Sequence, residues 1–446
     1  MVLCSMETGL CLMKIIKLIA LVFILLRCSS PIDTITILEP VHISNDSIVR
    51  TGLDVLIEDH PSYLKGRSIG LVTNHTGITK SNEKNYELFQ GNPAISLKRI
   101  FAPEHGFYGE ASAGAKVDYD GKNTSGPEII SLYGKTRKPT KEMLDGIDLI
   151  IYDIQDVGAR FYTYISTLGI VMEAAGEHGI DVMVLDRPNP IGGEIIEGAI
   201  LDTAFKSFVG YYPIPTRYAL TVGELSQMAV KEGWLSSVPP KLTVIKMDGW
   251  KRYMFYDDTD LPWTPPSPNI PDLETAIIYP GMCLYEATNL SEGRGTKKPF
   301  KQIGAPWMNF DLAKEMQSLG IEGADFTYSK FKPKNLPGIA ENPKFENTRC
   351  LGQEIAVKDK YKYRAVEAAI HSIYITFGFY TDEFRYKPGR LGKLFGTDQL
   401  FRLLNGQLRN ANNKVIKVPS GLFKLLEEDR EEFLVQAQER SCGAVV

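Results

Sequence analysis

The chain has 446 residues, which is too long for one ordinary hydrophobic core and predicts two domains. A hydrophobic content of 43%, a charged content of 23% and a formal net charge of −4 are typical of a soluble globular protein. This charge gives no electrostatic reason to expect a nucleic acid as a partner. The sequence has no GxGxxG or GxxxxGK[ST] phosphate loop and no GxSxG elbow, so dinucleotide-binding, P-loop and α/β-hydrolase functions have no support.

The start of the chain carries the pattern of a secretory signal peptide. Lys14 and Lys17 precede a short apolar run over Leu18–Leu26, which is too short to span a bilayer. We therefore predict a signal peptide over residues 1–27 and export to the periplasm or cell envelope. Leu25–Cys28 resembles a bacterial lipobox, so Cys28 could carry a lipid that anchors the protein to a membrane. Residues 28–50 are predicted to form a polar lead.

After this lead, apolar runs alternate with segments of helical periodicity. The runs predict strands at Ser68–Thr73, Ser96–Ala102, Ile147–Ile154, Asp181–Leu185 and Leu242–Met247. Helices are predicted between them, at Glu83–Gln90, Tyr164–Glu177 and Leu220–Glu232. Thr221 and Glu224 have the spacing of a capping box at the start of the last helix. This alternation predicts an α/β fold with a Rossmann-like parallel sheet, which forms a catalytic domain over residues 51–262.

Five prolines between Leu261 and Leu273 exclude this segment from a helix or a central strand. We interpret residues 263–273 as a linker, although a rigid loop that lines the site would give the same pattern. Residues 274–446 are predicted to form a second, smaller C-terminal α/β domain that contributes to the cleft. Helices are predicted there at Asp311–Leu319, Arg364–Tyr374, Thr397–Leu404 and Gly421–Glu439.

Four of the predicted strands end in polar residues that can take part in chemistry. These strand-end clusters lie at Asn74–Thr76, Glu104–Gly106, Gln155–Arg160 and Asp186–Pro190. In an open parallel sheet, ligands bind in the crevice outside the carboxyl ends of the strands. The clusters therefore predict one active-site mouth, and an enzyme is the leading interpretation.

The cluster after the second strand places a carboxyl group beside an imidazole. Aromatic neighbours could partly desolvate Glu104 and raise its pKa, as a general acid requires. His105 is a second catalytic candidate in the same turn, and Glu110 is a weaker candidate a few residues on. The alternative is a turn in which Glu104 only caps the next helix.

The other two clusters offer residues that could bind a polar substrate. Asp156 could accept hydrogen bonds from substrate hydroxyls, and Arg160 could form a bidentate pair with a carboxylate. A structural pair between Asp156 and Arg160 would account for the same residues. Asp186 and Asn189, in a loop made rigid by two prolines, could be preorganised for a ligand or serve the loop itself.

In the C-terminal part, Glu286–Thr296 is predicted to form a strand that leads into a glycine-punctuated loop. Glu292 and Arg294 lie in this loop and could approach a ligand closely, although a β-bulge would have the same pattern. Trp307 could be a platform on which a sugar stacks, or a half-buried core tryptophan.

No HxH, HExxH or CxxC spacing predicts a metal centre. His75 and His105 could still meet beside Asp156 and bind a metal, as a metal-dependent amidase or deacetylase would require. The leading interpretation uses neither a metal nor a cofactor. Cys283 and Cys350 could form a disulfide, which the sequence leaves open.

Six motifs, which are specific in combination, carry a resemblance to a known family. They are Thr73–Gly77, Phe101–Gly106, Tyr152–Arg160, Leu185–Pro190, Tyr279–Gly281 and Asn289–Thr296. With this set, the chain from about Gly52 to near its C-terminus resembles the NamZ family of exo-acting β-N-acetylmuramidases. The resemblance implies a Rossmann-like N-terminal domain without a nucleotide, an auxiliary C-terminal α/β domain and release of terminal N-acetylmuramic acid from peptidoglycan fragments. The family's motif glutamate falls on Glu104.

The candidate residues agree with peptidoglycan-derived, muramic-acid-terminated saccharides as partners. We expect Glu104 to protonate the leaving oxygen, while Glu292 or Asp156 stabilises the oxocarbenium ion or orients the acetamido group. Muramic acid carries a lactyl carboxylate, which one of three arginines could bind: Arg160, Arg187 or Arg294. Further substrate contacts are expected from the motif residues Asn74, His75, Glu110, Asp186, Asn189, Asn289 and from Trp307. A non-catalytic module that only binds peptidoglycan is a further alternative.

Overall fold

The computed structural model describes residues 34–41, 49–109, 126–309, 311–408 and 418–440. The predicted signal peptide, the candidate lipid-bearing Cys28 and Glu110 lie outside these residues. Within the described ranges, none of the helices combines the length and the apolar character that a membrane crossing needs.

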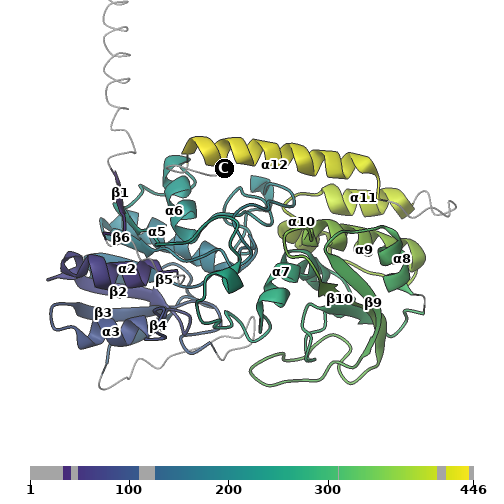
Figure 1. The fold of residues 1–446 in the computed structure, drawn as a ribbon, viewed down its shortest axis with the longest axis horizontal. Helices are drawn as coiled ribbons and strands as arrows, with labels where there is room; N and C mark the ends of the chain where they lie inside the picture. Colours follow the sequence, from purple (N-terminus) through teal and green to yellow (C-terminus); the bar gives the residue numbers. More distant parts are fainter. Residues whose placement is uncertain (1–33, 42–48, 110–125, 310, 409–417, 441–446) are drawn as a thin grey trace, which may run out of the picture.

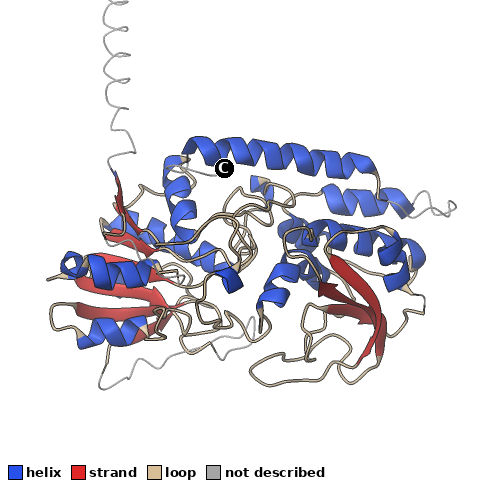
Figure 2. Cartoon of the chain, viewed as in Figure 1, coloured by secondary structure: helices blue, strands red, loops and turns tan. Residues whose placement is uncertain are grey.

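In the described part of the chain, a seven-stranded parallel sheet forms the N-terminal half (Figures 1 and 2). Its strand order is β1-β7-β6-β5-β2-β3-β4. The strands are β1 (Ile35–Leu38), β2 (Ser68–Thr73), β3 (Ser96–Ala102), β4 (Glu128–Ser131), β5 (Leu149–Asp153), β6 (Asp181–Leu185) and β7 (Leu242–Ile245). The helices are α2 (Gly52–Asp59), α3 (Asn85–Gly91), α4 (Lys141–Leu144), α5 (Thr163–His178) and α6 (Val222–Lys231), with short 3-10 turns η2 (Pro61–Leu64), η3 (Thr203–Phe205) and η4 (Tyr256–Asp258).

Helices cover both faces of this sheet, because successive residues of a strand point to opposite sides. Leu71 of β2 and Ile151 of β5 pack with the side chains of α2 and α3. The next residue of β2, Val72, and the preceding residue of β5, Ile150, pack with α5 and α6 on the other side. The strands are therefore apolar on both faces, as in other parallel sheets.

The Rossmann-like parallel sheet predicted from the sequence is confirmed, and the five predicted strands and three predicted helices are present within three residues at each end. The capping box of α6 is also present, with Thr221 and Glu224 bonded reciprocally. Two strands were not predicted. The lead that we expected to be merely polar contains β1, which pairs with β7, and β4 extends the opposite edge of the sheet. Both are edge strands of four residues, too short for a clear periodic pattern.

The C-terminal half combines a three-stranded antiparallel sheet with helices, among the described residues. Its strand order is β8-β10-β9, with β8 (Gln302–Ala305), β9 (Ala324–Phe331) and β10 (Cys350–Val357). The helices are α7 (Leu273–Met282), α8 (Leu312–Ser318), α9 (Ala365–Phe379), α10 (Pro388–Phe395), α11 (Gln399–Leu408) and α12 (Ser420–Arg440). A smaller C-terminal α/β unit, predicted from the sequence, is thus confirmed.

One expectation for this half is wrong, and one question that the sequence left open is answered. The segment that begins at Glu286 is not a strand: α7 continues directly into the 3-10 helix η5 (Cys283–Ala287), and a loop follows. Cys283 and Cys350 are both buried and both free, so they form no disulfide.

The two halves share one hydrophobic core, which runs from Val72 in β2 to Ala437 in α12. In Figure 1 the helix α12, in yellow, lies along the top of both halves. The predicted linker is a loop that leads from η4 to α7. The shared core explains how residues from both halves can be held rigidly around one site.

Arg160 connects the halves by polar contacts and is completely buried. Its guanidinium donates to the backbone carbonyls of Ala199 at 2.6 Å, Ile214 at 2.7 Å and Leu394 at 2.9 Å, the last of these in α10. The expectation that Arg160 reads a substrate carboxylate, or pairs with Asp156, is therefore replaced by a structural role.

We expect Arg160→Met to lower the free energy of unfolding by about 3 kcal/mol or more, because three buried carbonyls would lose a charged donor. Chemical denaturation followed by circular dichroism measures this change. Arg402→Met is the matched control, since the Arg402 side chain is 74% exposed. Equal stability of the two variants would show that Arg160 does not tie the halves together.

Candidate active site

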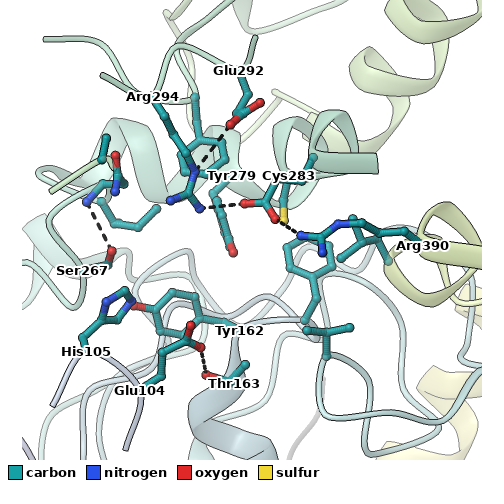
Figure 3. Close-up of a pocket in the computed structure, with 18 of the residues that line it drawn as sticks. Glu104, His105, Tyr162, Thr163, Ser267, Tyr279, Cys283, Glu292, Arg294 and Arg390 are labelled. Atoms are coloured by element: carbon teal, nitrogen blue, oxygen red, sulfur yellow. Dashed lines mark hydrogen bonds and ion pairs between the residues drawn. The ribbon is translucent and has the colours of Figure 1, made fainter. Parts of the chain in front are cut away.

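A cavity of about 940 Å³ lies where the carboxyl ends of β3, β4 and β5 face the C-terminal half. Figure 3 shows Glu104, His105 and Thr163 on one side, and Glu292, Arg294 and Cys283 across from them. The two sides come from the two halves of the chain. A volume of this size is suited to a small ligand.

Glu104 reaches the cavity through a sharp turn after β3. His105 and Gly106 both have left-handed backbones, with φ of 69° and 74°, and this reverses the chain. Glu104 is half-buried, and its Oε2 accepts a 2.6 Å hydrogen bond from the hydroxyl of Thr163, the first residue of α5. The carboxyl group is thus held at a fixed place beside the N-terminus of a 16-residue helix.

Tyr133 lies beside Glu104 because of the register between β3 and β4. Ala102 pairs with Ser131, so Glu104 and Tyr133 each follow their paired residue by two positions. Burial raises the pKa of the Tyr133 phenol, and the Glu104 carboxylate, which is its hydrogen-bond partner, raises it further. The Glu286 carboxylate adds to the same rise, so Tyr133 lies within electrostatic reach of both acids.

Glu286, in η5, is the second acid of the cavity and is held by two arginines. Its carboxylate accepts from Arg294 at 2.7 Å and from Arg390 of α10 at 2.6 Å. Burial alone would raise the pKa of Glu286, but these two guanidinium groups outweigh burial and hold the pKa below its ordinary value. Glu286 is therefore anionic near neutral pH.

Glu292 lies next to this pair and serves mainly the surrounding structure. Its carboxylate is 2.9 Å from Lys344 Nζ and 3.6 Å from Arg294 Nε. Lys344 also donates to two backbone carbonyls, those of Tyr285 and Leu290. In the view of Figure 3, Arg294 stands between Glu292 and Glu104. Glu292 thus orients Arg294, which in turn orients Glu286.

Four of the predicted site residues line this cavity: Glu104, His105, Glu292 and Arg294. Asp156 does not. It is buried among Tyr218 and the backbone amide of Gly158, both of which donate to its Oδ2, and burial raises its pKa to about 6. The prediction that Asp156 acts beside Glu104 is therefore corrected to a role in fixing the loop after β5.

The cluster after β2 also turns away from the cavity. Asn74 donates to Tyr164 Oη at 2.9 Å and accepts from Thr76, while His75 Nε2 bonds to the carbonyl of Pro265 at 2.8 Å. These contacts hold the strand-end loop against α5 and against the proline-rich segment. Neither side chain lines the cavity.

The cluster after β6 is likewise structural. Asp186 accepts from Gly223 N and Thr221 Oγ1 at the start of α6, and burial raises its pKa to about 7. Arg187 forms a buried ion pair with Asp153 at 2.6 Å, while Asn189 donates to a backbone carbonyl of the following loop.

Two further candidates lie in the C-terminal half, away from the cavity. Asn289 exchanges hydrogen bonds with the backbone of Glu383 and Arg385, and the Trp307 ring packs edge-on against Tyr380 at 5.1 Å. The contacts of Trp307 therefore fit the alternative interpretation, a half-buried core tryptophan, better than a platform on which a sugar stacks.

The metal-dependent alternative has no residues to support it within the described ranges. They contain no group of three or more His, Cys, Asp or Glu side chains placed to hold a metal ion. His75 and His105 do not meet around Asp156, since only His105 lines the cavity.

Several residues that line the cavity were not predicted as site residues from the sequence; they include Tyr133, Arg137, Tyr162, Thr163, Ser267, Asn269, Tyr279, Glu286, Lys344, Arg390 and Lys393. Tyr133 and Arg137 follow β4, whose signal was the short run Ile129–Leu132 before Gly134. Tyr279 stood in a recognised motif, but no role was assigned to it. Ser267 and Asn269 show that the proline-rich segment lines the site, as one of the two interpretations allowed.

A Rossmann-like domain and a smaller α/β domain thus enclose a cavity that is lined by four glutamates, and a pair of carboxyl groups at the scissile bond is the usual equipment of glycosidases. The family of exo-β-N-acetylmuramidases named NamZ matches the chain in both parts: its N-terminal model over residues 69–274 and its C-terminal model over residues 277–437. The chain belongs to this family, as the motifs around Glu104 predicted.

Similar proteins agree with this assignment. A Bacillus subtilis (strain 168) protein named peptidoglycan β-N-acetylmuramidase NamZ is 45% identical over 350 residues, which cover 78% of this chain and 82% of the relative. A crystal structure of a Bacteroides fragilis DUF1343 family protein, 31% identical, has a TM-score of 0.78 and covers 90% of this chain and 100% of its own. A second such B. fragilis structure, 30% identical, has a TM-score of 0.69, with coverages of 88% and 98%.

Proposed function

We propose that this protein is an exo-β-N-acetylmuramidase, which releases terminal N-acetylmuramic acid from the non-reducing end of peptidoglycan fragments during cell-wall turnover. The observation that carries the proposal is that Glu104 and the arginine-held Glu286 line the same cavity of a NamZ-family chain. The B. subtilis relative is named for the same bond type.

In this proposal Glu104 donates its proton to the glycosidic oxygen as the bond from that oxygen to the anomeric carbon breaks. Thr163 orients the carboxyl group, and Tyr133 is its second hydrogen-bond partner. Glu286, which is anionic, stabilises the positive charge that develops on the sugar or orients the acetamido group. Water then adds to the anomeric carbon and gives one proton to the Glu104 carboxylate, which restores the acid. Glu286 takes the part that we expected of Glu292 or Asp156.

The test is hydrolysis of a chromogenic N-acetylmuramide beside the matching N-acetylglucosaminide. We expect release from the muramide only, and stepwise release of N-acetylmuramic acid from a defined muramic-acid-terminated oligosaccharide, followed by mass spectrometry. Equal release from both sugars, or cleavage inside the oligosaccharide, would refute the proposal. A non-catalytic peptidoglycan-binding module would bind the oligosaccharide and leave it intact.

The two arginines that bond to Glu286 lead to a prediction about the acid limb of the kcat/KM profile against pH. Arg294 and Arg390 lower the pKa of Glu286, so Arg390→Gln should raise that pKa. Protonated Glu286 cannot stabilise a cation, and the acid limb of kcat/KM should therefore move to higher pH in the variant. A pH–rate profile measures the shift, with Arg402→Gln as the control. An unchanged acid limb would mean that Glu286 is not the group that titrates.

Export is also proposed, from the sequence of residues 1–27, and Cys28 is the proposed lipid attachment point. Cell fractionation of the wild type and of Cys28→Ser tests both ideas. A membrane-bound wild type and a released variant would support anchoring, whereas a wild type that stays in the cytoplasm would contradict export.

A further inference from the structure

The cavity is richer in positive charge than the chain as a whole. Five cationic and four acidic side chains line it, which gives a net charge of +1 with His105 neutral, while the whole chain carries −4. The cations are Arg137, Arg294, Lys344, Arg390 and Lys393, and the acids are Glu104, Glu286, Glu292 and Glu341. Such a lining favours an anionic ligand.

Three of the five cations already have carboxylate partners within the protein. Arg294 bonds to Glu286 and lies beside Glu292, Arg390 bonds to Glu286, and Lys344 bonds to Glu292. Arg137 and Lys393 remain. Neither forms an ion pair with any carboxylate among the residues that the structure describes.

Arg137 is held in an orientation suited to a planar anion. Its guanidinium lies over the ring of Phe208, with Cζ 4.1 Å from the ring centroid, and Phe208 packs against Tyr133 at 6.1 Å. A stacked guanidinium keeps its N–H edge free for a bidentate bond to a carboxylate. Arg137 also opposes the rise in the pKa of Tyr133, so it lies near the group that bonds to Glu104.

Lys393 lies near the same short segment, residues 207–210, which contains Phe208. A Cβ placed on Gly210 would be 3.7 Å from the carbonyl oxygen of Lys393, and Ser207, Phe208 and Val209 line the cavity. The guanidinium of Arg137 and the backbone of Lys393 are therefore both close to this segment, and both residues line the cavity.

We propose that Arg137 is a specificity-determining residue, which binds a carboxylate of the substrate at the rim beside Glu104, with Lys393 as a second, weaker contact. This inference rests on the proposed function, in which the substrate is a muramic acid. The carboxylate is either that of the lactyl group or one carried by an attached peptide. An N-acetylglucosaminide has no carboxylate in either place, so Arg137 would distinguish the two sugars.

The test measures binding and hydrolysis separately. By calorimetry, Arg137→Gln should weaken binding of N-acetylmuramic acid about 10- to 100-fold, as expected for a charged hydrogen bond, and change binding of its lactyl methylamide by less than about 2-fold. Arg137→Lys should retain part of the affinity for the acid. Arg402→Gln, an exposed arginine on α11, is the matched control and should bind both ligands as the wild type does.

A third ligand, N-acetylmuramic acid with an amide-linked dipeptide, assigns the source of the carboxylate. If Arg137→Gln weakens only this ligand, the arginine reads the peptide; if it weakens only the free acid, the arginine reads the lactyl group. An equal loss with acid, amide and dipeptide ligands, or no loss with any of them, would overturn the proposal.

Kinetics separate this inference from the proposed function. On a chromogenic muramide, Arg137→Gln should raise KM about as much as it weakens binding, and change kcat little. If the wild type binds N-acetylmuramic acid through Arg137 but hydrolyses no muramide, the proposed function fails and the inference stands. If the wild type hydrolyses the muramide, its methylamide and the dipeptide-bearing muramide equally well, the function stands and the inference fails.

Discussion

Glu104→Gln is expected to lower kcat on a muramic-acid-terminated disaccharide by about 100- to 10,000-fold, the range attributed to general acid catalysis. The glutamine keeps the shape of the side chain and can still meet the Thr163 hydroxyl, but it has no acidic proton to transfer to the leaving oxygen. Steady-state kinetics with quantified N-acetylmuramic acid measure the loss, and an unchanged thermal unfolding midpoint shows that the fold is intact.

The leaving group provides the control for this prediction. A nitrophenolate leaves without protonation, so Glu104→Gln should lose far less activity on a nitrophenyl muramide than on the disaccharide. Glu315→Gln, an exposed glutamate on α8, should match the wild type on both substrates. Near-normal turnover of the disaccharide by Glu104→Gln would remove Glu104 as the acid, and an equal loss on both substrates would indicate another role.

Glu286→Gln is expected to lower kcat by about 100- to 1,000-fold, the magnitude found when one preorganised electrostatic group is removed from an active site. Its negative charge is fixed by Arg294 and Arg390, and the transition state carries positive charge on the sugar. Because this stabilisation acts on the sugar and not on the leaving group, the loss should be the same on disaccharide and nitrophenyl substrates. Parallel kinetics on the two substrates measure it.

Glu292→Gln is the matched comparison for Glu286→Gln, since both glutamates bond to Arg294. Glu292 also pairs with Lys344, and we expect a loss of less than about 10-fold, because its part is to orient Arg294 rather than to face the sugar. A larger loss of kcat for Glu292→Gln than for Glu286→Gln would assign stabilisation of the sugar cation to Glu292 and orientation of Arg294 to Glu286. A similar melting temperature of the two variants excludes unfolding as the cause.

Much of the fold could be predicted because its strands and helices carry long, regular patterns. The run before Asp153 is apolar at every position, as a parallel strand covered on both faces requires, and Thr221 with Glu224 marked the start of α6. The short edge strands β1 and β4 were not predicted, because four residues are too few to distinguish a strand from a loop by their pattern. The end of η5 and the loop after it were taken for a strand because a single 3-10 turn has no distinctive period.

The candidate site was predicted in part. The cluster at Glu104 does face the cavity, and Glu292 and Arg294 do meet it from the other half. Asp156, Asp186 and Arg187 also follow strand ends, yet their polar atoms bond to loop amides, to the start of α6 and to Asp153. A polar residue that follows a strand end lies near the ligand crevice. Its side chain can face the ligand or form hydrogen bonds within its own loop, and the strand pattern does not distinguish the two.

The sequence by itself determined the α/β class, the order of the main elements, the family and the importance of the turn at Glu104. Only the tertiary structure decided which acid stands opposite. Glu286 is 182 residues from Glu104 along the chain, and it enters the cavity because α7 and η5 pack into the core shared by both halves. Local patterns record whether a segment forms a strand or a helix, whereas the direction of one carboxylate depends on long-range packing and on partners such as Arg294 and Arg390.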